Sequence, residues 1–306
     1  MTNKIAFNKK PGGQALYHLM ALFTVSIWGT TFVSTKVLMK NGLSPEDILF
    51  YRFMLAYLSI WIICPRKLFA YNLKDELLFI MSGACGGSLY FIAENRALGI
   101  TLASNVALIL CTTSIFTAFL SHLFVKGERL KKNLILGSLI ALAGVAFVVF
   151  NGSFVLKINP AGDILTIVAS LMWAFYGIIL KKLDSRYTTL FITRKVFFYG
   201  IITLLPAFFF SPLTTDKKIL FNPLVYGNLL FLGLVASMLC YILWNMCVKN
   251  LGAVRTTNYV YIVPLVTLIA SSLIIGEPIT LFAIMGAIFI LSGVYIAEKG
   301  FGKKRS

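Results

Sequence analysis

The sequence predicts an all-α membrane protein in which ten transmembrane helices form two inverted five-helix repeats, with both termini in the cytoplasm. Three observations lead to this fold class: the composition, the spacing of the apolar runs and a repeat of half the chain. Of the 306 residues, 58% are hydrophobic and 13% are charged, and the mean hydropathy is +0.86. Soluble domains are typically ~45–50% apolar and ~25% charged, so the composition indicates a lipid bilayer as the surroundings.

Apolar runs of the length that a helix needs to cross a bilayer, ~20 residues, follow one another along the whole chain. Short connections separate them, several contain proline, and none is long enough for a soluble domain. A basic N-terminus precedes the first run, but the run is too long for a signal peptide and no small-residue cleavage site follows it. The predicted spans, in order, cover residues 16–35, 46–64, 75–97, 101–125, 133–150, 161–180, 190–210, 224–247, 254–275 and 281–298.

The distribution of basic residues predicts the orientation of these spans. With a cytoplasmic N-terminus, 21 of the 28 lysine and arginine residues fall on the cytoplasmic side and six on the other. This bias follows the positive-inside rule and places both termini in the cytoplasm. Arg194 and Lys195 are interpreted as part of it. Because the basic residues lie in short clusters between apolar runs, the net charge of +17 does not indicate a nucleic-acid partner.

A motif of one glutamate and two glycines occurs twice at an offset of 149 residues, in GERLKKNLILGSLIALAG and GEPITLFAIMGAIFILSG. The chain therefore divides into two five-span repeats, residues 16–150 and 161–298. Because five is odd, the second repeat starts on the opposite side of the membrane, as in many secondary transporters. Glycines seven residues apart allow close helix contact, and a glutamate suits a helix N-terminus. We therefore predict packing glycines and capping glutamates at Gly137, Gly144, Gly286, Gly293, Glu128 and Glu277.

With SIWGTTFVSTK in the first span and ENRALGITLASNVALIL between the third and fourth spans, these features make the chain resemble an EamA-type member of the drug/metabolite transporter superfamily. The resemblance covers residues 16–298. It implies ten helices in the plasma (inner) membrane, a central cavity lined by spans 1–4 and 6–9, and peripheral spans 5 and 10. Ile115 stands where such proteins often carry proline, opposite Pro264 in the second repeat, which puts a helix kink in the fourth span in doubt.

Ionisable residues inside spans are functional candidates because the bilayer penalises them. Arg52 lies about 10 Å and Glu94 about 7–8 Å from the external face, at 1.5 Å per helical residue, so the two side chains could meet. Three interpretations stay open: a structural ion pair between spans 2 and 3, a pair that also binds the charged groups of a substrate, and an unpaired Glu94 that acts as a proton site.

Aromatic and small polar residues recur at helical spacing and therefore share helix faces. Such faces should turn away from lipid, where polar groups would be unsatisfied. An interfacial aromatic belt or a packing hydrogen bond between helices is the alternative for each of them. The predicted substrate-binding residues are Trp28, Thr31, Arg52, Tyr90, Glu94, Asn95, Asn105, Trp173, Tyr176, Tyr241, Asn245, Asn258 and Tyr261.

These features favour a secondary transporter of small polar or amphipathic metabolites, and the resemblance suggests export of amino acids or related compounds. Translocation of drugs, cations or lipid-linked intermediates is the alternative. We expect no enzyme, because His18 and His122 are far apart and no catalytic constellation accompanies them. The five cysteines fall within spans without a CxxC pair, so we predict no metal site and no cofactor. The expected partners are a small-molecule substrate and the lipid bilayer, with proton coupling open and a monomer or homodimer as the assembly.

Overall fold

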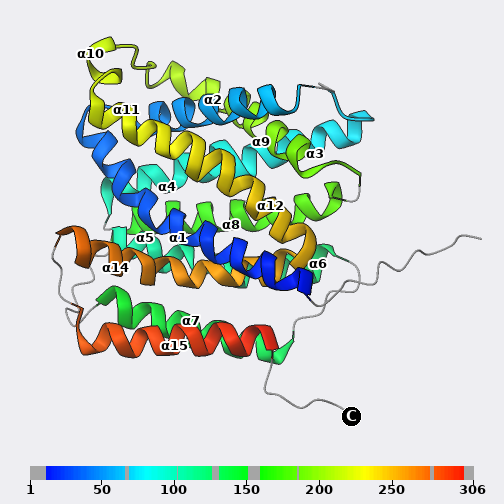
Figure 1. The fold of residues 1–306 in the computed structure, drawn as a ribbon, viewed down its shortest axis with the longest axis vertical. Coiled ribbons are helices and arrows are strands. Elements are labelled where there is room, and N and C mark those ends of the chain that lie inside the picture. Colours follow the sequence, from blue (N-terminus) through cyan, green and yellow to red (C-terminus); the bar gives the residue numbers. More distant parts are fainter. Residues whose placement is uncertain are drawn as a thin grey trace, which may run out of the picture.

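The chain folds into a bundle of helices that run roughly alongside one another (Figure 1). A computed structural model describes residues 12–65, 69–101, 103–125, 131–150, 159–184, 186–275 and 279–299, and all regular secondary structure in these ranges is helical. The helices are α1 (Gly12–Lys40), α2 (Pro45–Ile63), α3 (Leu73–Gly83), η1 (Ala84–Ser88), α4 (Leu89–Ile100), α5 (Ala103–Leu110), α6 (Thr113–Phe124), α7 (Lys132–Phe150), α8 (Pro160–Leu183), α9 (Thr189–Leu204), η2 (Leu205–Phe209), α10 (Lys217–Leu220), α11 (Pro223–Leu230), η3 (Phe231–Leu239), α12 (Cys240–Leu251), α13 (Ala253–Thr257), η4 (Asn258–Ile262), α14 (Val263–Ile275) and α15 (Leu281–Lys299).

A helix lies over each of the ten predicted ranges, and within the described residues seven helical runs are long and apolar enough to cross a membrane by length and composition. The helix α2 is not among them, because Glu46, Asp47 and Arg52 interrupt its apolar sequence. The seven runs are Gln14–Lys40, Leu73–Ile100, Val106–Phe124, Lys132–Val149, Pro160–Leu183, Thr189–Phe209 and Pro223–Leu251. The fold is thus that of a multi-span membrane protein.

Polar side chains fix where several helices begin. Ser44 accepts a hydrogen bond from the backbone N–H of Asp47, and the Asp47 carboxylate accepts one from the backbone N–H of Ser44, which forms a complete capping box before α2. Proline occupies the first turn of α2, where its missing N–H costs no helical hydrogen bond. Side chains cap other helices in the same way: Asn72 before α3, Asn159 before α8, Thr188 before α9 and Asn222 before α11.

A helix break occurs in the fourth predicted span even though Ile115 stands in place of proline. The helices α5 and α6 are separated by a turn at Cys111 and Thr112. The Thr112 hydroxyl donates to the Ile109 carbonyl (2.6 Å), and the Cys111 thiol donates to the Ala107 carbonyl (3.2 Å). Side chains that bond to carbonyls of the preceding turn can interrupt a helix without proline, so the helix break that the missing proline put in doubt is present.

The two helices α7 and α15 form a closely packed pair at one edge of the bundle (Figure 1). All four glycines predicted to pack lie in their contact. A Cβ atom at Gly293 would lie 2.4 Å from the backbone N of Ala141, and one at Gly144 would lie 2.7 Å from the carbonyl of Gly286. The prediction that these glycines allow close helix contact is confirmed. Glu128 and Glu277, predicted as caps, lie outside the described residues.

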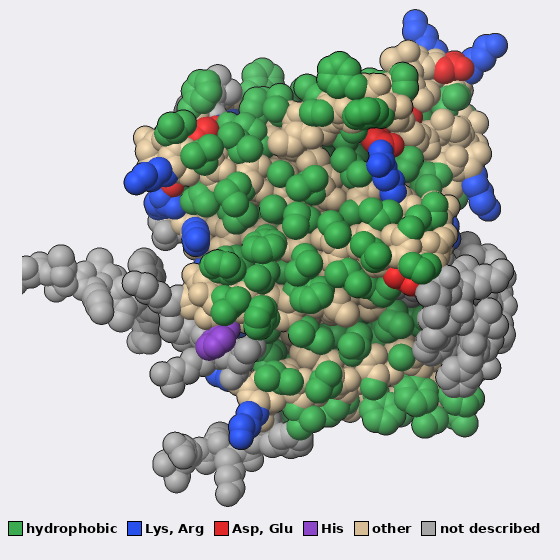
Figure 2. All heavy atoms as spheres, turned by 180° about the vertical axis from the view of Figure 1, so that it is seen from behind, with side chains coloured by type: hydrophobic (Ala, Val, Ile, Leu, Met, Phe, Trp, Pro, Cys, Tyr) green, Lys and Arg blue, Asp and Glu red, His purple; other side chains and the backbone are tan. Residues whose placement is uncertain are grey.

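The outer surface matches a bilayer. Figure 2 shows hydrophobic side chains across the middle of one face, while lysine, arginine, aspartate and glutamate gather toward its two side edges. Because the helices run from one of these edges to the other in Figure 1, the apolar band covers their middles and the charges mark their ends. Exposed large apolar residues on α7 and α15, such as Leu139, Ile288 and Leu291, contribute to this lipid-compatible surface.

We expect Gly293→Ala to lower the thermal unfolding temperature of the purified protein, because its new methyl group would overlap backbone atoms of α7. Overpacking of a close contact costs about 1–3 kcal/mol. Gly227→Ala is the matched control, since a Cβ at Gly227 meets nothing within 4 Å. Equal unfolding temperatures for the two variants in a detergent-based thermal shift assay would contradict the close contact.

Candidate functional site

A cavity lies at the centre of the bundle, between α1, α2, α4, α5, α6, α8 and the η4–α14 segment. The free space in it amounts to about 60 Å³, which is room for a few water molecules. The lining residues are Trp28, Thr31, Phe32, Arg52, Tyr90, Phe91, Glu94, Ala107, Leu110, Thr113, Trp173, Val260 and Val263.

Six of the predicted substrate-binding residues line this cavity: Trp28, Thr31, Arg52, Tyr90, Glu94 and Trp173. They come from the four helices α1, α2, α4 and α8. The spacing of three or four residues that put Trp28 with Thr31, and Tyr90 with Glu94, on one helix face thus turns these pairs inward. The Thr31 hydroxyl donates to the carbonyl of Trp28 in its own helix (2.8 Å).

Two buried side chains of opposite charge form the polar part of the wall. The Arg52 Nε donates to the Ser237 hydroxyl (2.8 Å), and its guanidinium carbon lies 4.3 Å from the centre of the Phe91 ring. Glu94 accepts a hydrogen bond from the Tyr90 hydroxyl (2.8 Å). The ion pairs within 4.0 Å among the described residues do not include one between Arg52 and Glu94. Each charge therefore keeps hydrogen-bonding capacity directed at the cavity.

Aromatic rings form the apolar part of the wall. The Trp28 and Trp173 rings meet edge to face with centroids 5.3 Å apart, and Trp173 lies 4.8 Å from the Tyr90 ring. The Trp28 indole N–H donates to the carbonyl of Ala236 (3.0 Å), which fixes the ring across to η3. Trp244, which the sequence reasoning did not select, supports Trp28 from behind at 4.9 Å. The sequence does indicate a role for Trp244, since it lies three residues after Tyr241 on the same helix face.

Three predicted residues lie behind this wall and support it. The Tyr176 hydroxyl donates to the Asn245 amide oxygen (2.7 Å), and the Asn245 amide nitrogen donates to the Thr193 hydroxyl (2.9 Å). The Tyr241 hydroxyl donates to the carbonyl of Gly86 (2.6 Å). These bonds link α8, α9, α12 and η1, so they satisfy buried polar groups and hold the helices that carry the wall.

The remaining predicted residues lie elsewhere. The Asn95 amide donates to the Pro45 carbonyl (3.5 Å), next to an ion pair between Arg96 and Glu46 (2.6 Å) that the sequence reasoning missed. Asn258 is buried but is not among the lining residues, and Tyr261 belongs to a separate apolar cluster with Cys111 and residues of α7 and α15. The side chain of Asn105 lies outside the described residues.

Arg194 and Lys195 correct another expectation. They were assigned to the positive-inside surface, but both lie within α9 and are only 2% and 3% exposed. The Arg194 guanidinium donates to the carbonyl of Cys64, and the Lys195 ammonium forms an ion pair with Glu76. A position five or six residues inside an apolar helix was the available signal that these cations need partners within the protein.

One half-buried carboxyl group stands at the end of α8. Asp184 follows the last residue of that helix, and its Oδ1 atom is buried without a hydrogen-bond partner. Burial raises the pKa of Asp184 from its ordinary value of 3.8 to about 6, while the ammonium group of Lys249 acts in the opposite direction. The charged form is therefore disfavoured in the folded protein.

The chain is similar to known transporters over almost its whole length. The sequence profile of the EamA-like transporter family matches residues 15–150 and 160–298. An uncharacterized transporter of Archaeoglobus fulgidus is 30% identical over 283 residues, which is 91% of this chain and 96% of the relative. A protein named probable amino-acid metabolite efflux pump of Escherichia coli K12 is 29% identical over 288 residues, 91% of this chain and 93% of the relative.

One more distant relative and one solved structure are also similar to this chain. A protein named probable terminal-alkyne amino-acid exporter of Streptantibioticus cattleyicolor is 24% identical over 286 residues, 93% of this chain and 94% of the relative. A solved crystal structure shares the fold with a TM-score of 0.72 at 14% sequence identity, and the match covers 93% of this chain and 97% of that chain.

We expect Asp184→Asn to raise the unfolding temperature by a few °C at pH 7.5 and to have little effect near pH 4. Because the pKa of Asp184 is higher in the folded than in the unfolded chain, stability is lost as pH rises from about 4 through about 6. Thermal shift measurements of both proteins across this range check it. An unfolding-temperature difference that does not change with pH would contradict the assignment.

Proposed function

Because the chain belongs to the EamA-like transporter family, we propose that it is a secondary transporter that exports amino acids or related small amphipathic metabolites through the central cavity. Relatives named as amino-acid metabolite efflux pumps and as an amino-acid exporter support this substrate class. The observation that carries the proposal is the pair of opposite charges in the cavity wall, a guanidinium at Arg52 and a carboxylate at Glu94, which line one cavity without forming an ion pair within 4.0 Å.

A zwitterion complements this wall. Burying a charge without an ion pair is costly, and among the described residues the guanidinium and the carboxylate donate to or accept from neutral hydroxyls, with Phe91 against the guanidinium. An amino acid brings a carboxylate for Arg52 and an ammonium group for Glu94. Its side chain would lie against the aromatic rings of Trp28 and Trp173, which bind both apolar groups and cations.

The contacts between helices support the proposed arrangement as ten spans in two inverted repeats. Each of the five spans of the first half has a counterpart at the same place in the second half. When every helix in a contact is replaced by its counterpart, the result is another contact that the structure contains. The contact of α1 with α12 corresponds to that of α8 with α4, and the contact of α2 with η3 corresponds to that of α9 with η1. The helices α7 and α15 are each other's counterparts, so their contact is unchanged by this replacement. Such an arrangement can offer one site to either side of the membrane in turn.

The sequence supports a secondary rather than a primary mechanism. It contains no nucleotide-binding P-loop, so the driving force would come from the substrate gradient or from protons. The positive-inside bias supports cytoplasmic termini, and membership of the EamA-like transporter family supports a multi-pass location in the inner membrane.

The proposal is tested with inside-out vesicles that contain the protein, a panel of labelled amino acids, and a protonophore in half of the samples. We expect accumulation of at least one panel member, and its loss with the protonophore would indicate proton coupling. If no panel member accumulates, the amino-acid substrate is wrong, and cationic drugs and lipid-linked intermediates become the next candidates.

We expect Glu94→Gln and Arg52→Gln each to reduce uptake into these vesicles by at least about tenfold, because a hydrogen bond between charged groups contributes about 1.5–3 kcal/mol. The matched control is Lys40→Gln, which removes an exposed charge at the end of α1, outside the cavity lining. All variants are compared at equal amounts of monodisperse protein. Uptake equal to that of the control in both cavity variants would exclude this cavity as the substrate site.

A further inference from the structure

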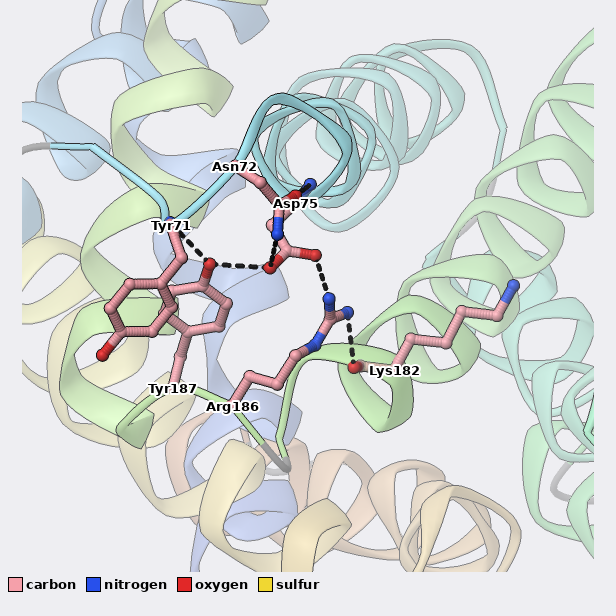
Figure 3. Close-up of polar contacts among 6 residues, drawn as sticks. All are labelled: Tyr71, Asn72, Asp75, Lys182, Arg186 and Tyr187. Atoms are coloured by element: carbon pink, nitrogen blue, oxygen red, sulfur yellow. Dashed lines mark hydrogen bonds and ion pairs between the residues drawn. The ribbon is translucent and has the colours of Figure 1, made fainter.

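A network of charged and phenolic side chains joins the two halves of the chain at the end of the bundle where α3 begins (Figure 3). At its centre is Asp75, whose side chain is only 1% exposed. One of its carboxylate oxygens accepts from the Arg186 guanidinium, and the other accepts from the Tyr187 hydroxyl (2.8 Å). Asp75 belongs to the first half, whereas Arg186 and Tyr187 lie between α8 and α9 in the second.

Further bonds hold both partners of Asp75 in place. The Tyr187 hydroxyl accepts from the backbone N–H of Tyr71 (2.8 Å), and the two tyrosine rings stack with centroids 4.9 Å apart. The Arg186 guanidinium also donates to the carbonyl of Lys182 (2.9 Å), and the Lys182 side chain extends away from the network (Figure 3). Arg186 is therefore positioned by the end of α8.

A second pair lies one residue further along α3. One Glu76 oxygen accepts from the Lys195 ammonium and from the Tyr199 hydroxyl, and the other accepts from the backbone N–H of Ala70 (2.7 Å). The Lys195 side chain is 4% exposed, and its nitrogen lies 5.0–5.9 Å from the centres of five aromatic rings, including Phe79 and Tyr199. These contacts join α3 to the middle of α9.

At the opposite end of the bundle, the helix that corresponds to α3 is α11, and its start packs through apolar side chains. Asn222 caps α11 at a position 150 residues after Asn72, which caps α3. Val225 in the first turn of α11 is fully buried, in a cluster with Leu43 and Ile48 at the junction of α1 and α2. The two helix starts are therefore capped alike but contact the other half differently, α3 through ion pairs and α11 through apolar packing. A polar contact between the halves at the α11 end comes from Asp47 in α2, which accepts from the backbone N–H of Thr214 (2.9 Å).

We propose that Asp75, Glu76, Arg186, Tyr187, Lys195 and Tyr199 form a cytoplasmic lock, which keeps the cavity closed to the cytoplasm until the bonds between the two halves break. The proposal rests on the proposed function and orientation. Trp173 in the cavity wall lies ten residues before the end of α8, about 15 Å along the helix, so α8 connects the cavity directly to the lock. Opening requires α3 to separate from α9, and water must then enter to solvate the released charges.

The π-helical segments give α3 and its counterpart a place to bend. The π-helix η1 follows α3 directly, and η3 follows α11 directly. Hydrogen-bond registers in such segments are irregular, and they are frequent at functional sites. The lock residues of α3 all lie before η1, so this part of the helix can swing while α4, with Tyr90 and Glu94, stays in the cavity wall.

The test measures how fast a thiol in the cavity reacts with a membrane-impermeant methanethiosulfonate reagent added to inside-out vesicles. The thiol is introduced by Thr31→Cys, and the half-buried Cys64 and Cys85 are replaced by serine. The same protein without Thr31→Cys gives the background. With Arg186→Gln added, we expect a labelling rate about two- to fivefold higher, which corresponds to losing a partly exposed ion pair.

Lys182→Gln is the matched control, because it removes a neighbouring cation whose side chain does not bind Asp75. Arg186→Lys should restore much of the slow labelling, since it keeps the charge. Tyr187→Phe keeps the stacked ring, loses one bond to Asp75 and should accelerate labelling in the same direction, and it carries the test if Arg186→Gln does not fold.

Equal labelling rates for Arg186→Gln, Tyr187→Phe and Lys182→Gln would overturn the lock. The readout needs no substrate, so it separates the lock from the proposed function. Faster labelling in a protein that accumulates no amino acid would refute the proposed substrate and support the lock. Unchanged labelling in a protein that transports amino acids would refute the lock alone.

Discussion

The structure depends on one constraint, which is that a charge placed among apolar helices must find its partner inside the protein. Three carboxylates obey it with a cation from another part of the chain: Glu46 with Arg96, Asp75 with Arg186 and Glu76 with Lys195. Water reaches Arg96 and Arg186, whose side chains are partly exposed, whereas Lys195 in the middle of α9 is buried among aromatic rings. The two charges of the central cavity depart from this pattern, and that departure sets the cavity apart from the structural pairs.

A second consequence of the bilayer concerns helix packing. Lipid chains are as apolar as leucine, so helices associate through close contact and interhelical hydrogen bonds. Glycines provide the close contacts here, between α7 and α15 and between α3 and α9, where a Cβ at Gly83 would lie 2.4 Å from Cβ of Tyr199. Hydroxyl and amide groups provide the hydrogen bonds, as between Tyr176 and Asn245. The support of the cavity wall combines both kinds of contact.

Much of this was predictable from the sequence, because the relevant signals are local. Length and hydropathy predict the helices, and spacing predicts that Tyr90 and Glu94 share a face. How deep a side chain lies in the bundle is not a local signal, because it depends on contacts between distant parts of the chain. The same spacing rule selected Tyr176 and Asn245, which lie one layer behind the cavity because the rings of neighbouring helices fill the space in front. Lys195 was missed for a related reason, since only the fold brings Glu76 close enough to stabilise a cation inside α9.

The contrast between the two ends of the bundle explains how two similar halves could behave differently. In a perfectly symmetric pair of repeats, the contacts that close each end would have the same strength, and neither side of the membrane would be preferred. Here an equivalent helix start carries Asp75 and Glu76 at one end and Val225 at the other. Ionic contacts are directional and are replaced by water when they break, whereas apolar contacts are lost in proportion to the area exposed. In the proposed transport cycle, this difference in chemistry between the two helix starts would be enough to make the energies of the two open states unequal.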